Sequence, residues 1–160
     1  MSAITTGLTA LLASGLLVTP ADGGAVLGPG GYKSLHLNQP EAAAESTGLL
    51  IDKDATNRCH LYYLHPNEGQ TNVGSGVFAD PTIGLVMIGG TSTSHTPEGV
   101  TLGTREFQVR KAYPHLEPVP PVPNVMRTPV PGHPDRYYRF AFDQGRVTDF
   151  ALEAANMGTC

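Results

Sequence analysis

The chain of 160 residues has a formal net charge of −4, with 40% hydrophobic and 15% charged residues. This length fits one domain or two small units that share a core. The acidic balance lacks the dense Lys/Arg footprint of a nucleic-acid-binding protein, and it also argues against binding to an anionic membrane surface. We therefore expect no nucleic-acid partner.

Residues 1–25 are typical of an export signal. The run LTALLASGLLV, from Leu8 to Val18, has the length of a signal's hydrophobic region and is too short to span a bilayer. Small residues follow it, and cleavage after Ala21 or Ala25 fits them. A buried helix is the alternative, because MSAITT carries no Lys or Arg. Export predicts a secreted or cell-envelope protein, with no stable membrane insertion after the signal is removed.

The segment 26–90 is expected to form a first unit of helix, strand and hairpin. In LHLNQPEAAAESTG, Pro40 takes the favoured first position of a helix, and EAAAE has strong helix propensity. The motif CHLYYLH, residues 59–65, is typical of a strand. The motif FADPTIGLVMI, residues 78–88, is typical of a hairpin.

The same kinds of element recur in the segment 100–160, after an expected linker at 91–99. VTLGTREFQVRKAY holds a polar turn and a short helix, DRYYRFAFD a second strand with a Tyr-Tyr pair, and FDQGRVTDFAL a second hairpin. The Pro-dense stretch 117–134 is expected to be an extended surface loop, because proline does not suit a helix or a central strand. A docking segment for an aromatic groove is the alternative.

This recurrence predicts an α+β fold, with two tandem helix–strand–hairpin units that share one antiparallel sheet and carry their helices on one face. The motifs LHLNQPEAAAESTG, VTLGTREFQVRKAY and RFAFDQGRV resemble those of the SmpA/OmlA family of small outer-membrane lipoproteins. In tandem they resemble the β-lactamase inhibitor protein family. The resemblance spans residues 31–153 and implies the same fold and a non-enzymatic function in binding other proteins. Asn38, however, stands where the turn usually has Gly.

Cys59 and Cys160 are expected to form a disulfide, since an even number of cysteines in an exported chain favours pairing. Two unrelated thiols are the alternative. The inhibitors that the chain resembles typically close a disulfide inside each unit, whereas this bond would join the first unit to residue 160. The Cα atoms of Cys59 and Cys160 should lie within about 7 Å of each other.

No catalytic residue, metal site or cofactor is expected. The six His residues form no HxxxH motif on a predicted helix and no Cys/His zinc spacing. His60 and His65 lie five positions apart in a strand, so they should point to opposite faces. The chain has no GxSxG elbow, and its Gly/Ser/Thr-rich stretch is not followed by the Lys of a phosphate loop.

The two Tyr-Tyr pairs predict a binding surface. Phe140 shares a strand face with Tyr138, and we expect that face to be the core. Matching the pairs then places Tyr63 inside with Tyr138, and Tyr62 outside with Tyr137.

The uncovered sheet face should therefore present His60, Tyr62, Tyr137 and Arg139, and tyrosine and arginine together are typical of interface hot spots. An ordinary solvated sheet face is the alternative. The predicted function is an exported, non-enzymatic, inhibitor-like module whose partner is another protein. The alternatives are a small secreted hydrolase or metal-dependent enzyme that uses loop residues, and a structural component of the cell envelope.

Overall fold

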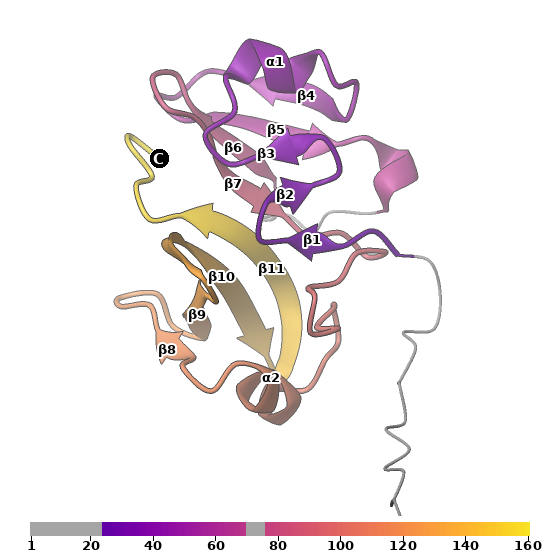
Figure 1. Ribbon diagram of the computed structural model, residues 1–160, viewed down its shortest axis with the longest axis vertical. Helices are drawn as coiled ribbons and strands as arrows, with labels where there is room; N and C mark the ends of the chain where they lie inside the picture. Colours follow the sequence, from indigo (N-terminus) through magenta and orange to yellow (C-terminus); the bar gives the residue numbers. More distant parts are fainter. Residues whose placement is uncertain (1–23, 70–75) are drawn as a thin grey trace, which may run out of the picture.

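A computed structural model of the chain describes residues 24–69 and 76–160, so residues 1–23 of the expected export signal lie outside the described residues. Within these ranges the fold is mostly β, with one eight-stranded sheet, one three-stranded sheet and two short α-helices (Figure 1). All strand pairs in both sheets are antiparallel.

The large sheet has the strand order β4-β5-β6-β7-β11-β10-β9-β8. Its strands are β4 (Leu50–Asp54), β5 (His60–Leu64), β6 (Val77–Asp80), β7 (Gly84–Gly89), β8 (Glu117–Pro118), β9 (Val125–Val130), β10 (His133–Asp143) and β11 (Arg146–Ala154). The small sheet consists of β1 (Leu27–Gly28), β2 (Gly31–Tyr32) and β3 (Leu35–His36). The helices are α1 (Glu41–Glu45), α2 (Glu106–Ala112) and the single 3-10 turn η1 (Pro66–Glu68).

The expected α+β fold of two tandem helix–strand–hairpin units is wrong, because strand accounts for 44% of the described residues and helix for only 11%. The first helix ends after five residues. Beyond it, the hydroxyls of Ser46 and Thr47 donate to the carbonyls of Ala43 and Ala44 at 2.7 and 2.6 Å. Such local bonds compete with the continuation of a helix.

The Pro-dense stretch 117–134, expected to be a surface loop, contributes strands instead. It supplies β8, β9 and the first residues of β10, and the segment LLIDKDATNR, residues 49–58, contains β4. Pro129 is tolerated within β9 because β8 pairs only with Met126 and Arg127, which leaves the remainder of β9 at the sheet edge. The expected linker 91–99 is packed rather than loose, since Thr91 and Thr96 are fully buried.

One face of the large sheet forms the core, and we call it the covered face. A row of directly opposed residues crosses this face from β5 to β10, and its members are Tyr62, Val77, Ile88, Leu152 and Tyr138. All five are buried. Helix α1 lies over the β5 end, where the Tyr62 hydroxyl donates to Glu45 at 2.6 Å. At the β10 end, Tyr113, which follows α2, packs against Tyr138 with ring centroids 5.7 Å apart.

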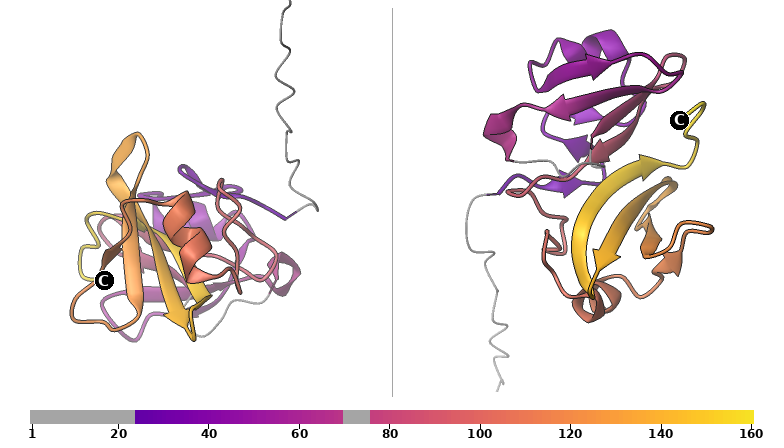
Figure 2. Two further views of the ribbon diagram at one scale, coloured as in Figure 1. Left: turned by 90° about the horizontal axis from the view of Figure 1, so that it is seen from below. Right: turned by 180° about the vertical axis from the view of Figure 1, so that it is seen from behind.

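The small sheet covers the same face, since the Tyr138 hydroxyl donates to the carbonyl of Leu27 at 3.2 Å. Strand β1 lies on one side of β11, and the end of the chain lies on the other (Figure 2). The second face of the large sheet therefore has no helix or second sheet over it within the described ranges. We call it the open face, and it is marked by the row Leu61, Phe78, Met87, Glu153 and Tyr137.

Candidate functional site

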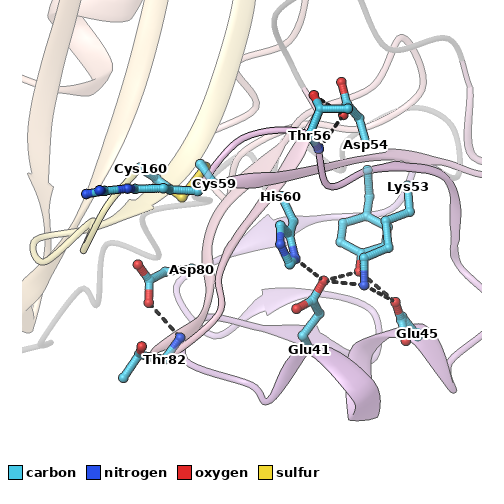
Figure 3. A network of polar contacts seen from close by, with 12 residues as sticks. Glu41, Glu45, Lys53, Asp54, Thr56, Cys59, His60, Asp80, Thr82 and Cys160 are labelled. Carbon is cyan, nitrogen blue, oxygen red and sulfur yellow. Dashed lines mark hydrogen bonds and ion pairs between the residues drawn. A yellow bond between two sulfur atoms is a disulfide. The ribbon is translucent and has the colours of Figure 1, made fainter.

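The predicted disulfide is confirmed. Cys59 and Cys160 are bonded, with their Cα atoms 4.8 Å apart (Figure 3). The same end of the chain is fixed a second time, because the Thr159 amide and hydroxyl both donate to Asp80 Oδ2, at 2.8 and 2.7 Å. These bonds, from the Thr159 amide first, hold the pKa of Asp80 well below its ordinary value. Thr159 and Cys160 are therefore held beside β5 and β6.

Two of the four predicted binding residues, His60 and Tyr62, lie on the covered face, so their expected outward position is wrong. Tyr62 is only 2% exposed. Its ring lies under α1, and its hydroxyl donates to both Glu41 and Glu45. The His60 Nδ1 atom lies 2.8 Å from Glu41 Oε1. Tyr62 is buried, His60 is half-buried, and both contact Glu41, which argues against a binding role for this pair.

A charged network joins these residues to α1 (Figure 3). The Lys53 ammonium, from β4, lies 2.8 Å from Glu41 and 3.0 Å from Glu45. Burial opposes ionisation of Glu41, but hydrogen bonds from Lys53, Tyr62 and His60 outweigh it and lower the pKa of this carboxyl to about 2. Burial, with the hydrogen bond to Glu41 second, raises the pKa of Tyr62. The network thus attaches a helix of five residues, which is too short to be stable alone, to the sheet.

Glu41→Gln is expected to lower the free energy of unfolding at pH 7 by about 1–3 kcal/mol, the usual cost of losing hydrogen bonds to a charged group. The folded-state pKa of Glu41 is about 2, below its ordinary value of 4.5. Its charge therefore stabilises the fold above pH 4.5, and this contribution is lost as the pH falls towards 2. Urea unfolding followed by circular dichroism should show the variant and the wild type converging over that range.

Glu106→Gln is the matched control, since Glu106 occupies the first turn of α2. It forms an exposed i,i+4 pair with Arg110 at 2.7 Å. The loss of such a pair should cost only about 0.3–0.5 kcal/mol. Equal losses in the two variants at pH 7, with no convergence in acid, would contradict a stabilising role for the α1 network.

The other two predicted binding residues, Tyr137 and Arg139, lie on the open face and are half-buried. Arg139 is placed between two carboxylates of β11, with Nη1 3.3 Å from Asp149 and Nε 3.4 Å from Glu153. The Arg127 guanidinium lies 4.6 Å from the centre of the Tyr137 ring, which fits a cation–π contact. The fold thus brings Tyr137 and Arg139 together and separates them from His60 and Tyr62.

A hollow of about 230 Å³ opens on this face, and it is lined by Phe78, Met87, Arg139, Glu153, Met157 and Cys160. Its floor belongs to β6, β7, β10 and β11, and the disulfide-bonded end of the chain forms one side. Burial raises the pKa of Glu153, and the charges of Arg139 and Arg127 oppose this rise. Asp149 Oδ1 is buried and has no hydrogen-bond partner within the described ranges. The hollow is therefore apolar on one side and charged on the other.

Sequence reasoning missed Tyr63, Phe78 and Met87 as open-face residues. Alternation in β5 separates Leu61 and Tyr63 from Tyr62 and Leu64, but the two pairs are of the same composition, so the pattern does not show which pair faces outward. Nothing in the sequence of β7 distinguishes its two faces, because all six of its residues, GLVMIG, are glycine or apolar. Met87 is assigned to the open face only by its pairing with Phe78 and Glu153.

Among residues 24–69 and 76–160, no three His, Cys, Asp or Glu side chains are grouped so that they could hold a metal ion. The helices in these ranges are all too short or too polar to cross a membrane. The sequence matches no protein-family model, and it has no match among curated proteins or among solved structures.

Proposed function

We propose that this chain is an exported module that binds another protein through its open face. The strongest support is the row of Leu61, Phe78, Met87, Glu153 and Tyr137, which continues across five strands with no helix over it in the described ranges. Aromatic residues, methionine and arginine are enriched in the cores of protein interfaces. The open face combines these types with a hollow that can receive a side chain of the partner.

The open face has an apolar part and a charged part, and this arrangement suggests how a partner binds. Leu61, Tyr63 and Phe78 offer half-buried apolar surface over β5 and β6. Arg139 and Glu153 offer one charge of each sign over β10 and β11. A partner that places an apolar side chain in the hollow would exclude water from this ion pair, which strengthens its electrostatic interactions.

The cross-link between Cys59 and Cys160 supports the export part of the proposal. Disulfides persist in oxidising compartments outside the cytosol. The apolar run at residues 8–18 fits a secretion signal of the usual length. The resemblance to the β-lactamase inhibitor protein family adds a specific possibility, namely that the partner is an enzyme whose active site becomes blocked.

Photo-crosslinking in the secreted proteins of the producing cells tests the proposal. A photoreactive phenylalanine at position 63 should give a discrete covalent adduct, whereas the same group at Val26, an exposed residue beside β1, should not. The captured protein is then purified and titrated with variants. Tyr63→Ala and Tyr137→Ala should each weaken binding by about 2 kcal/mol, or thirtyfold, as hot-spot residues do.

Val26→Ala serves as the matched variant and should bind like the wild type. An affinity unchanged by the loss of both tyrosines, or equal adducts from positions 63 and 26, would rule out the open face. The inhibitor-like form has its own assay, in which a class A β-lactamase is titrated with the wild-type chain. Inhibition by the wild type that is lost in Tyr137→Ala would support an inhibitor function. Full β-lactamase activity at a high excess of the wild-type protein would exclude this target.

A further inference from the structure

A second surface, away from the hollow, surrounds α2 and the turn between β10 and β11 (Figure 1). Gln144 and Gly145 in this turn both have positive φ angles, 47° and 72°, as a tight two-residue hairpin requires. The segment before α2 pairs with the start of β11. The Gly103 amide donates to the Val147 carbonyl at 2.8 Å, and the Val147 amide donates to the Thr104 carbonyl at 2.9 Å.

This pairing places two arginines opposite each other. Arg105 and Arg146 form an antiparallel bridge, and both are exposed. Like charges directly opposite on paired backbone segments destabilise a fold. Arg146 donates to the carbonyl of Gly103 at 2.9 Å. The Arg105 guanidinium donates no hydrogen bond to any residue that the structure describes, so most of the donors of these two groups are available to a ligand.

An exposed aromatic ring lies beside these charges. Phe107 is 62% exposed, the largest exposure among the bulky apolar residues described. It lines a hollow of about 460 Å³ together with Arg105, Glu106, Arg110, Gln144, Gly145 and Arg146. Glu106 is already paired with Arg110 at 2.7 Å. The hollow therefore holds an excess of positive charge in a chain whose net charge is −4.

We propose that Arg105, Phe107 and Arg146 bind an acidic segment of a partner protein. Carboxylates would accept paired hydrogen bonds from the two guanidinium groups, which suit that planar geometry. An apolar side chain of the same segment would pack on Phe107. A protein segment fits better than a sulfated polysaccharide, which has no apolar group for this ring. It also fits better than an anionic membrane, since an interfacial helix needs a longer apolar face than one phenylalanine.

The test uses the whole chain and a fluorescent peptide that alternates Glu and Leu, with a Gln-for-Glu peptide for comparison. Fluorescence anisotropy should show salt-sensitive binding of the Glu peptide and none of the Gln peptide. Arg105→Ser combined with Arg146→Ser should weaken binding about tenfold or more, and so should Phe107→Ala. Arg58→Ser removes an exposed arginine elsewhere and should have no effect, as should Tyr63→Ala on the open face.

The proposal is overturned if the wild type does not bind the Glu peptide, or if the double arginine variant binds it as well as Arg58→Ser does. It is also overturned if phosphatidylserine vesicles or heparin bind in an Arg105- and Arg146-dependent manner while the peptide does not. The variant at Tyr63 keeps this result separate from the test of the open face, since the two surfaces share no residue.

Discussion

Tyr138→Ala is expected to lower the free energy of unfolding by about 3–5 kcal/mol, as truncation of a buried aromatic residue does. Tyr138 is fully buried on the covered face. Its ring packs against Tyr113, and its hydroxyl donates to Leu27 of the small sheet at 3.2 Å. The substitution would therefore leave a cavity between the large sheet, α2 and β1, and it would also leave the Leu27 carbonyl without this donor.

Tyr137→Ala is the matched substitution one position earlier in β10. Tyr137 is half-buried on the open face, where it contacts Arg127. Its loss should cost about 1 kcal/mol or less, the worth of an exposed cation–π contact. Urea unfolding with the disulfide intact measures both variants, and Tyr138→Phe separates the hydroxyl, worth about 1 kcal/mol, from the ring. Similar losses for Tyr137→Ala and Tyr138→Ala would mean that the open face is not open.

The sequence alone predicted the two faces of β10 but not those of β5. In β10, Phe140 shares alternate positions with Tyr138, and the polar Arg139 lies between them, so the apolar side is clear. In β5, both faces carry one leucine and one tyrosine. Only the cross-strand partners distinguish the two faces. Tyr62 opposes Val77, which lies on the covered face, whereas Leu61 opposes Phe78, which lies on the open face.

Matching the two Tyr-Tyr pairs failed for a topological reason. Strand β5 is second from one edge of the large sheet, whereas β10 is third from the other edge, so the pairs do not occupy equivalent positions. A shift of one residue then moved Tyr62 and Tyr63 to the wrong faces, since side chains alternate along a strand. The placement of Tyr137, Tyr138 and Arg139 did not depend on this match.

Two of the strands that sequence reasoning missed, β4 and β8, are the edge strands of the large sheet. Most of their residues are exposed, so they carry no apolar alternation. Local sequence patterns could not predict the open face either. Its row consists of one residue from each of five strands, β5, β6, β7, β11 and β10, whose order in the sheet the sequence does not show. The disulfide could be predicted because the chain has only two cysteines, so only one pairing is possible.

Replacing both Cys59 and Cys160 by Ser is expected to lower the free energy of unfolding by about 2–4 kcal/mol, the typical contribution of a disulfide. The bond joins residues 101 positions apart, and a loop of that length loses much conformational entropy in the unfolded chain when it is closed. Urea unfolding of the wild type and the double variant measures the difference. Coincident unfolding curves would mean that the cross-link contributes nothing to stability.

The double variant should also loosen one side of the open-face hollow, since Met157 and Cys160 line it. Asp80→Ala is the complementary change, because it removes the acceptor of both Thr159 bonds and leaves the disulfide intact. Hydrogen exchange at residues 157–159 should rise in both variants, and most when the two changes are combined. The cross-link is expected to stabilise mainly by restricting the unfolded chain. The cysteine variant should therefore lose more global stability than Asp80→Ala, although both variants increase local exchange. Unchanged exchange in all variants would mean that other contacts hold the end of the chain, so that neither the disulfide nor Asp80 shapes the hollow.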